Sequence, residues 1–231
     1  MNFSGVRTII FDLDGTLCRY GLSTAQAIAA TLERVGLSPA SLGDPDSVAT
    51  RYIELWHEEE KVRSPQPFRE RIWSRLLAEH GINEDGLAQV LGDTYISIRL
   101  PSLRLDPAAV PLLTALRPQY RLGLLTNGPG EMQWPKIERL SLEPHFDEII
   151  VAGDVGIYKP DPKVFQIVLS RLNEVPSRAL YVGDSYQMDV VGAKRAGLLS
   201  VWLNNSENNE PLDSVRPDAE IEQLFHLEGT L

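Results

Sequence analysis

The hydrophobic and polar residues follow two different patterns along the chain. Residues 8–11, Thr-Ile-Ile-Phe, form a short apolar and β-branched run that is typical of a strand buried on both faces. From residue 101 onward, patterns typical of strands and of helices alternate, which predicts βαβ units and a parallel sheet. The predicted strands are residues 121–126, 148–152, 179–183 and 200–203, and the predicted helices lie near residues 107–117, 131–140, 162–172 and 187–197.

The stretch between the first strand and residue 101 has a helical pattern throughout. Its hydrophobic residues recur at helical spacing in four stripes, and no segment of it is predicted to be a strand. Because this stretch separates the first strand from the rest of the sheet, we expect it to be an insertion. The predicted fold is α/β, with a Rossmann-like parallel sheet core (residues 1–17 and 101–231) and an inserted all-helical cap domain (residues 18–100). Residues 204–217 are predicted to form a surface loop before a short terminal helix.

Composition narrows the class of protein. The 231 residues are 43% hydrophobic and 23% charged, which is ordinary for a globular protein with a substantial core. A net charge of -10 argues against a groove for a nucleic-acid polymer. We find no apolar run long enough for a signal peptide or a membrane span, so we expect a cytoplasmic protein without a membrane partner. The single cysteine, Cys18, excludes an intrachain disulfide.

Four aspartates follow predicted strands and are candidate metal ligands. Asp12 and Asp14 come directly after the first strand, and Asp184 and Asp189 come after the strand at 179–183. Ligands of open α/β sheets bind at this edge. At about 4 Å and an effective dielectric near 20, each pair of like charges costs roughly 4 kcal/mol, so the cluster requires a cation or protonation. Oxygen ligands alone favour a hard divalent ion, with Mg²⁺ as the leading choice.

Three further polar residues extend this candidate site. Thr126 and Asn127 end the second predicted strand before Gly128, in a turn that can offer hydrogen-bond donors to an anion. Lys159 stands among prolines that stiffen the chain. Taken singly, these residues are typical of a capping threonine, a turn asparagine and a solvated lysine. Beside a cation and a nucleophilic carboxylate, they suit phosphoryl transfer.

Together these segments resemble the signature motifs of the haloacid dehalogenase (HAD) superfamily of phosphohydrolases. The resemblance covers residues 6–20 and 101–225, and the helical insertion is similar in type and position to the helical cap of that family. It implies a sheet in which the first, second and fourth core strands lie side by side. The matching motifs, in the order of the family, are Asp12-Leu13-Asp14-Gly15-Thr16, Thr126-Asn127, Lys159-Pro160 and Gly183-Asp184-x4-Asp189.

The resemblance implies a role for each catalytic residue. Asp12 would attack phosphorus and form an aspartyl-phosphate, while Asp14 would protonate the leaving oxygen and then activate water as a general acid and base. Thr126 and Asn127 would bind the transferring phosphoryl group. Lys159 would offset the negative charge that Asp12 and the phosphate share.

The resemblance also implies how the cofactor, Mg²⁺, is held. Its ligands would be the carboxylates of Asp12 and Asp184 and the main-chain carbonyl of Asp14. Asp189 would act through metal-bound water or by orienting its neighbours.

These motifs predict a Mg²⁺-dependent phosphatase for small phosphate monoesters. Asp14 favours a phosphatase over a dehalogenase, because a halide needs no proton to leave. A phosphomutase, a dehalogenase and a non-catalytic metal-binding module are the alternatives left open. The partner would be a small phosphorylated metabolite, but the sequence does not identify the metabolite or the oligomeric state. Candidate substrate contacts in the cap, for which core packing or a charged surface is the alternative, are Arg51, Trp56, His57, Arg63, Arg69 and Trp73.

Overall fold

The computed structural model describes residues 3–62, 64–204 and 214–231. The chain divides into two compact units, one comprising Met1–Arg19 with Arg104–Leu231 and the other Tyr20–Leu103. We call these the sheet unit and the helical unit.

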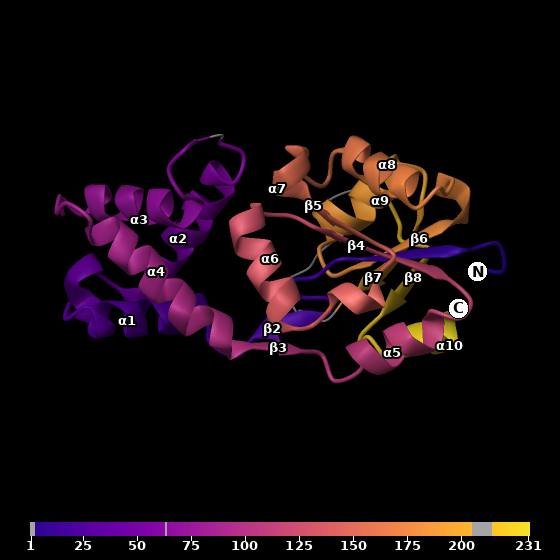
Figure 1. The fold of residues 1–231 in the computed structure, drawn as a ribbon, viewed down its shortest axis with the longest axis horizontal. Helices are drawn as coiled ribbons and strands as arrows, with labels where there is room; N and C mark the ends of the chain where they lie inside the picture. Colours follow the sequence, from indigo (N-terminus) through magenta and orange to yellow (C-terminus); the bar gives the residue numbers. More distant parts are fainter. Residues whose placement is uncertain (1–2, 63, 205–213) are drawn as a thin grey trace. The chain divides into compact units, whose positions relative to one another are not determined.

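The sheet unit contains a six-stranded sheet whose paired neighbours are all parallel (Figure 1). Its order is β5-β4-β1-β6-β7-β8, so the first, second and fourth predicted core strands are neighbours, as expected. Phe11 of β1 lies opposite Leu124 of β4 and Val182 of β6, which brings the carboxyl ends of these strands to one edge. The strands are β1 (Thr8–Phe11), β4 (Arg121–Thr126), β5 (Glu148–Val151), β6 (Ala179–Gly183), β7 (Leu199–Leu203) and β8 (Ala219–Ile221).

Helices follow most of these strands, as the alternating pattern predicted. The predicted helix at 187–197 is divided into a π-helical turn, Tyr186–Val191, and the short helix α9. Helix α8 begins where Asp161 accepts a hydrogen bond from the main chain of Lys163 and Pro162 occupies the first turn. The helices of this unit are α5 (Ala109–Leu116), α6 (Gly130–Arg139), α7 (Ala152–Val155), α8 (Pro162–Arg171), α9 (Gly192–Arg195) and α10 (His226–Thr230), with 3-10 turns at Glu143–His145 and Pro176–Arg178.

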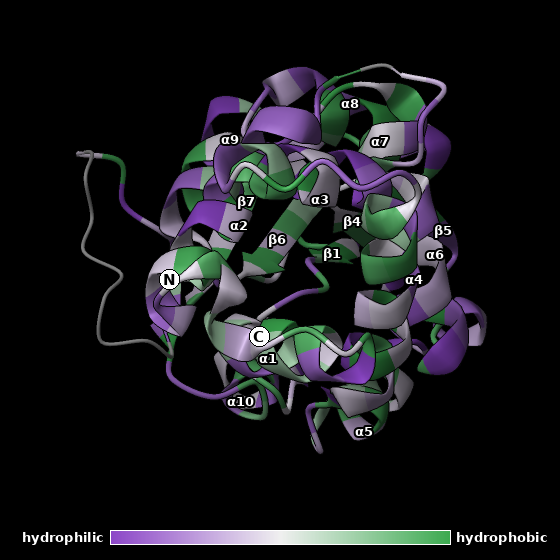
Figure 2. Ribbon diagram, turned by 90° about the vertical axis from the view of Figure 1, so that its left-hand side faces the viewer, coloured by the Kyte–Doolittle hydropathy of each residue, from purple (hydrophilic) through white to green (hydrophobic). Residues whose placement is uncertain are grey.

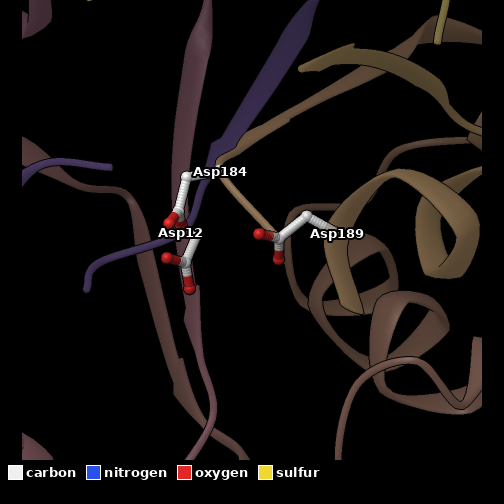
Figure 3. A group of neighbouring side chains, drawn as sticks. All are labelled: Asp12, Asp184 and Asp189. Carbon is white, nitrogen blue, oxygen red and sulfur yellow. The ribbon is translucent and has the colours of Figure 1, made fainter. Parts of the chain in front are cut away.

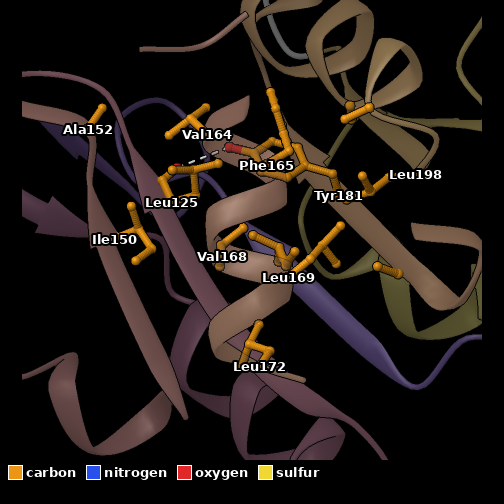
Figure 4. Packing of buried hydrophobic residues seen from close by; sticks show 14 residues of the cluster. Leu125, Ile150, Ala152, Val164, Phe165, Val168, Leu169, Leu172, Tyr181 and Leu198 are labelled. Atoms are coloured by element: carbon orange, nitrogen blue, oxygen red, sulfur yellow. Dashed lines mark hydrogen bonds between the residues drawn. The ribbon is translucent and has the colours of Figure 1, made fainter. Parts of the chain in front are cut away.

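The core of the sheet unit forms where α8 packs on the central strands, which carry mainly hydrophobic residues (Figure 2). Phe165 of α8 meets the ring of Tyr181 from β6 edge to face, with 5.1 Å between ring centroids. The hydroxyl of Tyr181 donates a hydrogen bond to the main-chain oxygen of Leu125 (3.0 Å), which ties β6 to β4 (Figure 4). Burial of each such large side chain stabilises the fold by about 1.5–3 kcal/mol.

The helical unit has its own aromatic core. The rings of Tyr52, Trp73 and Tyr95 lie 5.0–6.0 Å apart. Ser23 and Gln26 form a capping box at the start of α1, and Asp44 caps α2. The helices are α1 (Thr24–Arg34), α2 (Pro45–Glu59), α3 (Phe68–Glu79) and α4 (Leu87–Arg99), with 3-10 turns at Pro39–Leu42 and Leu100–Ser102.

Some short elements differ from the predictions. The prediction that residues 18–100 contain no strand is wrong at β2 (Cys18–Tyr20), which pairs with β3 (Leu103–Leu105) in a two-stranded sheet. Strand β8 was also not predicted. Strands of three residues are too short to show a periodic pattern, and β2 pairs with a segment distant in sequence. Most of the predicted loop at 204–217 lies outside the described residues.

Five of the six candidate substrate contacts are described by the structure, and they lie in the core of the helical unit or on its charged surface. Trp73 is fully buried, and Trp56 packs against Phe68 with 4.6 Å between ring centroids. Arg51 pairs with three glutamates, Arg69 pairs with an aspartate, and the side chain of His57 is 63% exposed. Arg63 lies outside the described residues. These placements fit the structural alternatives.

None of the helices in the described part of the chain is long and apolar enough to cross a membrane.

Glu59, at the end of α2, is the acidic centre of an ion-pair network in the helical unit. Its carboxylate accepts hydrogen bonds from Arg71 (2.8 Å) and Arg75 (3.0 Å). Burial raises the pKa of Glu59, but the two guanidinium groups outweigh it and hold the pKa below its usual value.

We therefore expect Glu59→Gln to lower the free energy of unfolding by about 1 to 2 kcal/mol at neutral pH. Because the pKa of Glu59 is lower in the folded state, this difference in the free energy of unfolding is fully present when the pH is above about 4.3, the usual pKa of a glutamate. It shrinks as the pH falls through the lower folded value. Urea denaturation of both proteins at several pH values measures it. Glu54→Gln, on the exposed side of the same helix, is the control and should cost less than about 0.5 kcal/mol. An equal cost for the two variants would contradict the prediction.

Candidate active site

Three carboxylates gather at the carboxyl edge of the sheet. Asp12 follows β1, Asp184 follows β6, and Asp189 lies in the π-helical turn beyond it. Their side chains point toward one another (Figure 3), and one oxygen of each lies within 4.8 Å of the others. Asp12 and Asp189 are buried, while Asp184 is partly exposed. The parallel pairing of β1 with β6 therefore brings Asp12 close to Asp184 and Asp189, which lie more than 170 positions later in the sequence.

Lys159 lies inside this cluster. Its Nζ donates to Asp12 Oδ1 at 2.6 Å, to Asp189 Oδ1 at 2.7 Å and to the hydroxyl of Tyr181 at 3.0 Å. An ammonium group has three protons, and these contacts use all three. The side chain is only 3% exposed, so this charge depends on its carboxylate partners rather than on water.

The electrostatics of the cluster favour an additional cation. Burial raises the pKa of Asp12 above its usual value; Lys159 lowers it, but Asp189 and Asp184 raise it further. Burial and the charge of Asp189 raise the pKa of Asp184 to about 6. Burial lowers the pKa of Lys159, but Asp12 and Asp189 raise it more, so the amine stays protonated. Three carboxylates and one ammonium leave two surplus negative charges, which a divalent cation would balance.

The donor set also fits Mg²⁺. The cluster offers carboxylate oxygens, without histidine or cysteine among its members, and hard cations of this kind bind oxygen. The hydroxyl of Thr16 lies 3.4 Å from Asp12 Oδ2 and 3.3 Å from Asp184 Oδ1, between the two carboxylates. The indole N–H of Trp202 donates to the main-chain oxygen of Asp184 at 2.9 Å, which fixes the turn that carries this ligand.

Asp14 lies elsewhere in the site than the sequence argument placed it. We expected four carboxylates around one point, but the acidic cluster of the described residues contains three, and the side chain of Asp14 is not among them. It faces α6 instead, where it pairs with Lys136 at 2.8 Å. The reason is electrostatic, because α6 supplies a positive charge that the sequence argument did not assign to the site.

Thr126 and Asn127 lie beside the cluster, but their side chains have protein partners. Thr126 Oγ1 accepts a hydrogen bond from Gln133 Nε2 at 2.6 Å. The amide of Asn127 donates to the main-chain oxygen of Lys159 (3.1 Å) and accepts from its main-chain N–H (2.9 Å). The Asn127 side chain thus anchors the backbone that presents Lys159.

Sequence reasoning missed Gln133, Lys136 and Tyr181. A signal for the first two was present, because both lie on the buried face of α6 together with Met132 and Ile137. Polar residues within an otherwise apolar helical stripe indicate a partner in the interior. Tyr181 gave no such signal, since an aromatic residue is common in a buried strand.

The comparisons with known proteins agree with this architecture. A family model described as haloacid dehalogenase-like hydrolase matches residues 6–197. The chain therefore belongs to the haloacid dehalogenase-like hydrolases, and the resemblance seen in its motifs is confirmed. It is an enzyme of the HAD hydrolase type, built as a Rossmann-like α/β core with a helical cap.

Individual relatives match over nearly their whole length. A glyceraldehyde 3-phosphate phosphatase of Methanopyrus kandleri is 30% identical over 223 residues, which is 94% of each chain. The pyrimidine 5′-nucleotidase YjjG of Escherichia coli is 36% identical over 232 residues, or 96% of each chain. Among solved structures, the HAD-hydrolase YfnB from Bacillus subtilis, bound to magnesium, aligns with a TM-score of 0.78 and 26% identity over 98% of each chain.

Gly15 allows the backbone after β1 to pass close to Asp184. Its φ is +87°, and a Cβ atom there would lie 2.2 Å from Asp184 Oδ2. A side chain at this position would thus strain the backbone and displace a candidate metal ligand.

We expect Gly15→Ala to weaken Mg²⁺ binding, measured by titration calorimetry, by more than about tenfold, which is 1.4 kcal/mol. Gly36→Ala is the matched control, because Gly36 has a similar φ of +82° but no atom within 4 Å of the added Cβ. It should cost about 1–2 kcal/mol of stability and leave Mg²⁺ binding unchanged. Unaltered Mg²⁺ binding in Gly15→Ala would show that Asp184 is not a ligand.

Proposed function

We propose that the protein is a Mg²⁺-dependent phosphatase that hydrolyses small phosphate monoesters through an aspartyl-phosphate. One observation carries the proposal. The buried Asp12 carboxylate lies within one cluster with Lys159, Asp184 and Asp189, at the sheet edge where ligands of this fold class bind. Attack on an anionic phosphate requires a nucleophile whose charge is offset, and here Lys159 offers a fixed ammonium group and the carboxylates offer a place for a divalent cation.

Asp12 would be the nucleophile and Asp14 the general acid and base. An oxygen of Asp12 would form a bond to phosphorus while the bond from phosphorus to the leaving oxygen breaks. Asp14 must carry a proton when the substrate binds, and it would give that proton to the leaving oxygen. Asp14 then takes a proton from the water that attacks the aspartyl-phosphate, which releases inorganic phosphate and regenerates Asp12. Lys159, held 2.6 Å from Asp12, orients this carboxylate and offsets the charge that gathers there.

The metal would be held by the carboxylates of Asp12 and Asp184 with the main-chain carbonyl of Asp14. When bound, Mg²⁺ would screen the repulsion between the nucleophile and the phosphate and stabilise charge in the transition state. Asp189 fits the orienting role better than that of a direct ligand, because its two oxygens accept hydrogen bonds from Lys159 (2.7 Å) and from the main-chain N–H of Ser185 (2.9 Å).

Phosphate recognition would combine Thr126 with main-chain N–H groups of the Thr126-Asn127-Gly128 turn. Asn127 would contribute mainly by fixing Lys159, since its side-chain amide already binds that backbone. This assignment refines the one implied by the family resemblance, in which both side chains bind the phosphoryl group.

The substrate would be a small phosphorylated metabolite. The relatives named above act, by their names, on glyceraldehyde 3-phosphate and on pyrimidine nucleotides, and another relative is a phosphoserine phosphatase. Asp14 supports ester cleavage over dehalogenation, because an alkoxide needs a proton to leave and a halide does not. We propose that the helical unit is the cap domain of this phosphatase. The cytoplasm is the compartment we propose.

A phosphate-release assay tests this function. We expect the purified chain to release inorganic phosphate from glyceraldehyde 3-phosphate, phosphoserine or a pyrimidine nucleotide with Mg²⁺. It should lose that activity in a chelator and regain it when Mg²⁺ is restored. Asp12→Asn should lower turnover by about a thousandfold or more, because loss of the nucleophile removes the covalent route, while circular dichroism shows that the variant still folds.

Asp93→Asn serves as the control, because Asp93 forms a half-exposed ion pair with Arg69 in the helical unit. It should retain full activity. Absence of phosphate release from every substrate, or substantial turnover by Asp12→Asn, would overturn the proposal.

A further inference from the structure

Helix α6 presents a buried lysine to Asp14. Lys136 Nζ lies 2.8 Å from both Asp14 Oδ1 and Asp14 Oδ2, and the lysine side chain is only 5% exposed. Burial raises the pKa of Asp14, but the charge of Lys136 and the hydrogen bonds from α6 outweigh it, so the pKa lies below its usual value. Lys136 on α6 therefore contacts both carboxylate oxygens of Asp14.

Gln133, one turn earlier on α6, holds Asp14 as well. Its Nε2 donates to Asp14 Oδ2 at 2.9 Å and to Thr126 Oγ1 at 2.6 Å. An ionised carboxylate only accepts hydrogen bonds, so the amide must turn its NH₂ group toward Asp14. In this orientation Gln133 Oε1 is buried without a hydrogen-bond partner among the described residues. Gln133 therefore makes the contacts with Asp14 and Thr126 at a cost in stability, because its Oε1 has no donor in the described part of the chain.

Packing alone does not explain these two side chains. Their neighbours on the same face of α6, Met132 and Ile137, are apolar and buried. A methionine or leucine would fill positions 133 and 136 without the cost of burying an amide and an ammonium group. What the polar side chains add is a fixed position for the carboxylate of Asp14, whose side chain is 40% exposed.

We propose that Lys136 and Gln133 are positioning residues for the general acid and base. This inference rests on the proposed function, in which Asp14 transfers the proton. Gln133 joins Asp14 to Thr126, so it fixes the carboxylate relative to the residue that would bind the phosphoryl group. Lys136 keeps the carboxylate from rotating into solvent. Neither residue gains or loses a proton in the reaction.

The proposal makes a prediction about the leaving group. An alkoxide leaves only with a proton from Asp14, whereas a nitrophenolate leaves without one. A misplaced Asp14 should therefore slow phosphoryl transfer from an alkyl phosphate far more than from nitrophenyl phosphate. A general loss of folded enzyme would lower both rates equally.

The experiment compares kcat/KM for glycerol phosphate and for nitrophenyl phosphate in Lys136→Met and Gln133→Leu, at saturating Mg²⁺. For Lys136→Met we expect a loss of about a hundredfold with glycerol phosphate and of less than about fivefold with nitrophenyl phosphate. Gln133→Leu should show the same selectivity and also weaken inhibition by inorganic phosphate, because Thr126 loses its partner.

Lys194→Met is the matched control. Lys194 forms an ion pair of 2.7 Å with Asp218 in the same unit, but neither residue belongs to the site. This variant should lower neither rate. Thermal melting of each variant establishes how much protein is folded.

Each remaining outcome has a clear meaning. The positioning role would be overturned if the wild-type chain cleaves both substrates and the ratio of kcat/KM for glycerol phosphate to kcat/KM for nitrophenyl phosphate is unchanged in Lys136→Met and Gln133→Leu. The proposed phosphatase activity would then still stand. Absence of phosphate release by the wild-type chain from these two substrates and from the three substrates of the phosphate-release assay would overturn the proposed function, and the inference with it. If Lys136→Met fails to fold, the ratio for Gln133→Leu decides.

Discussion

The candidate site depends on the ion pair between Lys159 and two buried aspartates. An ammonium group with 3% exposure is stable only where carboxylates replace its hydration, and Asp12 and Asp189 do so at 2.6 and 2.7 Å. The same contact holds the candidate nucleophile in one orientation. The hydroxyl of Tyr181 and the amide of Asn127 fix the lysine from two further sides. The fold thus immobilises a charge before any substrate arrives, which is the condition for electrostatic stabilisation of a transition state.

The parallel sheet makes this pair possible. β1 lies between β4 and β6, so the loops that carry Asp12, Thr126 and Asp184 leave the sheet at the same edge. Close approach at this edge requires residues without side chains. Gly15 passes Asp184, and a Cβ atom on Gly183 would lie 2.3 Å from Cγ of Asp189. The glycines of the motifs therefore have two functions: they allow the turns, and they leave room for the carboxylates of Asp184 and Asp189.

The two aspartates that follow β1 occupy separate electrostatic environments. Asp12 lies among carboxylates with Lys159, and Asp14 lies against α6 with Lys136. Two carboxylates one residue apart can take different roles only if their surroundings differ, and here each has its own lysine. The surplus negative charge stays with Asp12, Asp184 and Asp189, where a divalent cation would balance it. The Asp14–Lys136 pair has no net charge, so it adds nothing to this surplus.

The sequence by itself determined the alternating strands and helices, the helical insertion and the motif residues at strand ends, because these are local patterns of period and turn chemistry. It also brought Asp12, Asp184, Asp189 and Lys159 into one predicted site, since parallel strands share an edge. Only the tertiary structure decided that Asp14 turns to α6, that Asn127 binds the backbone of Lys159, and that β2 pairs with β3. These are contacts between side chains or short segments far apart in sequence, and their choice of partner depends on packing that no local pattern encodes.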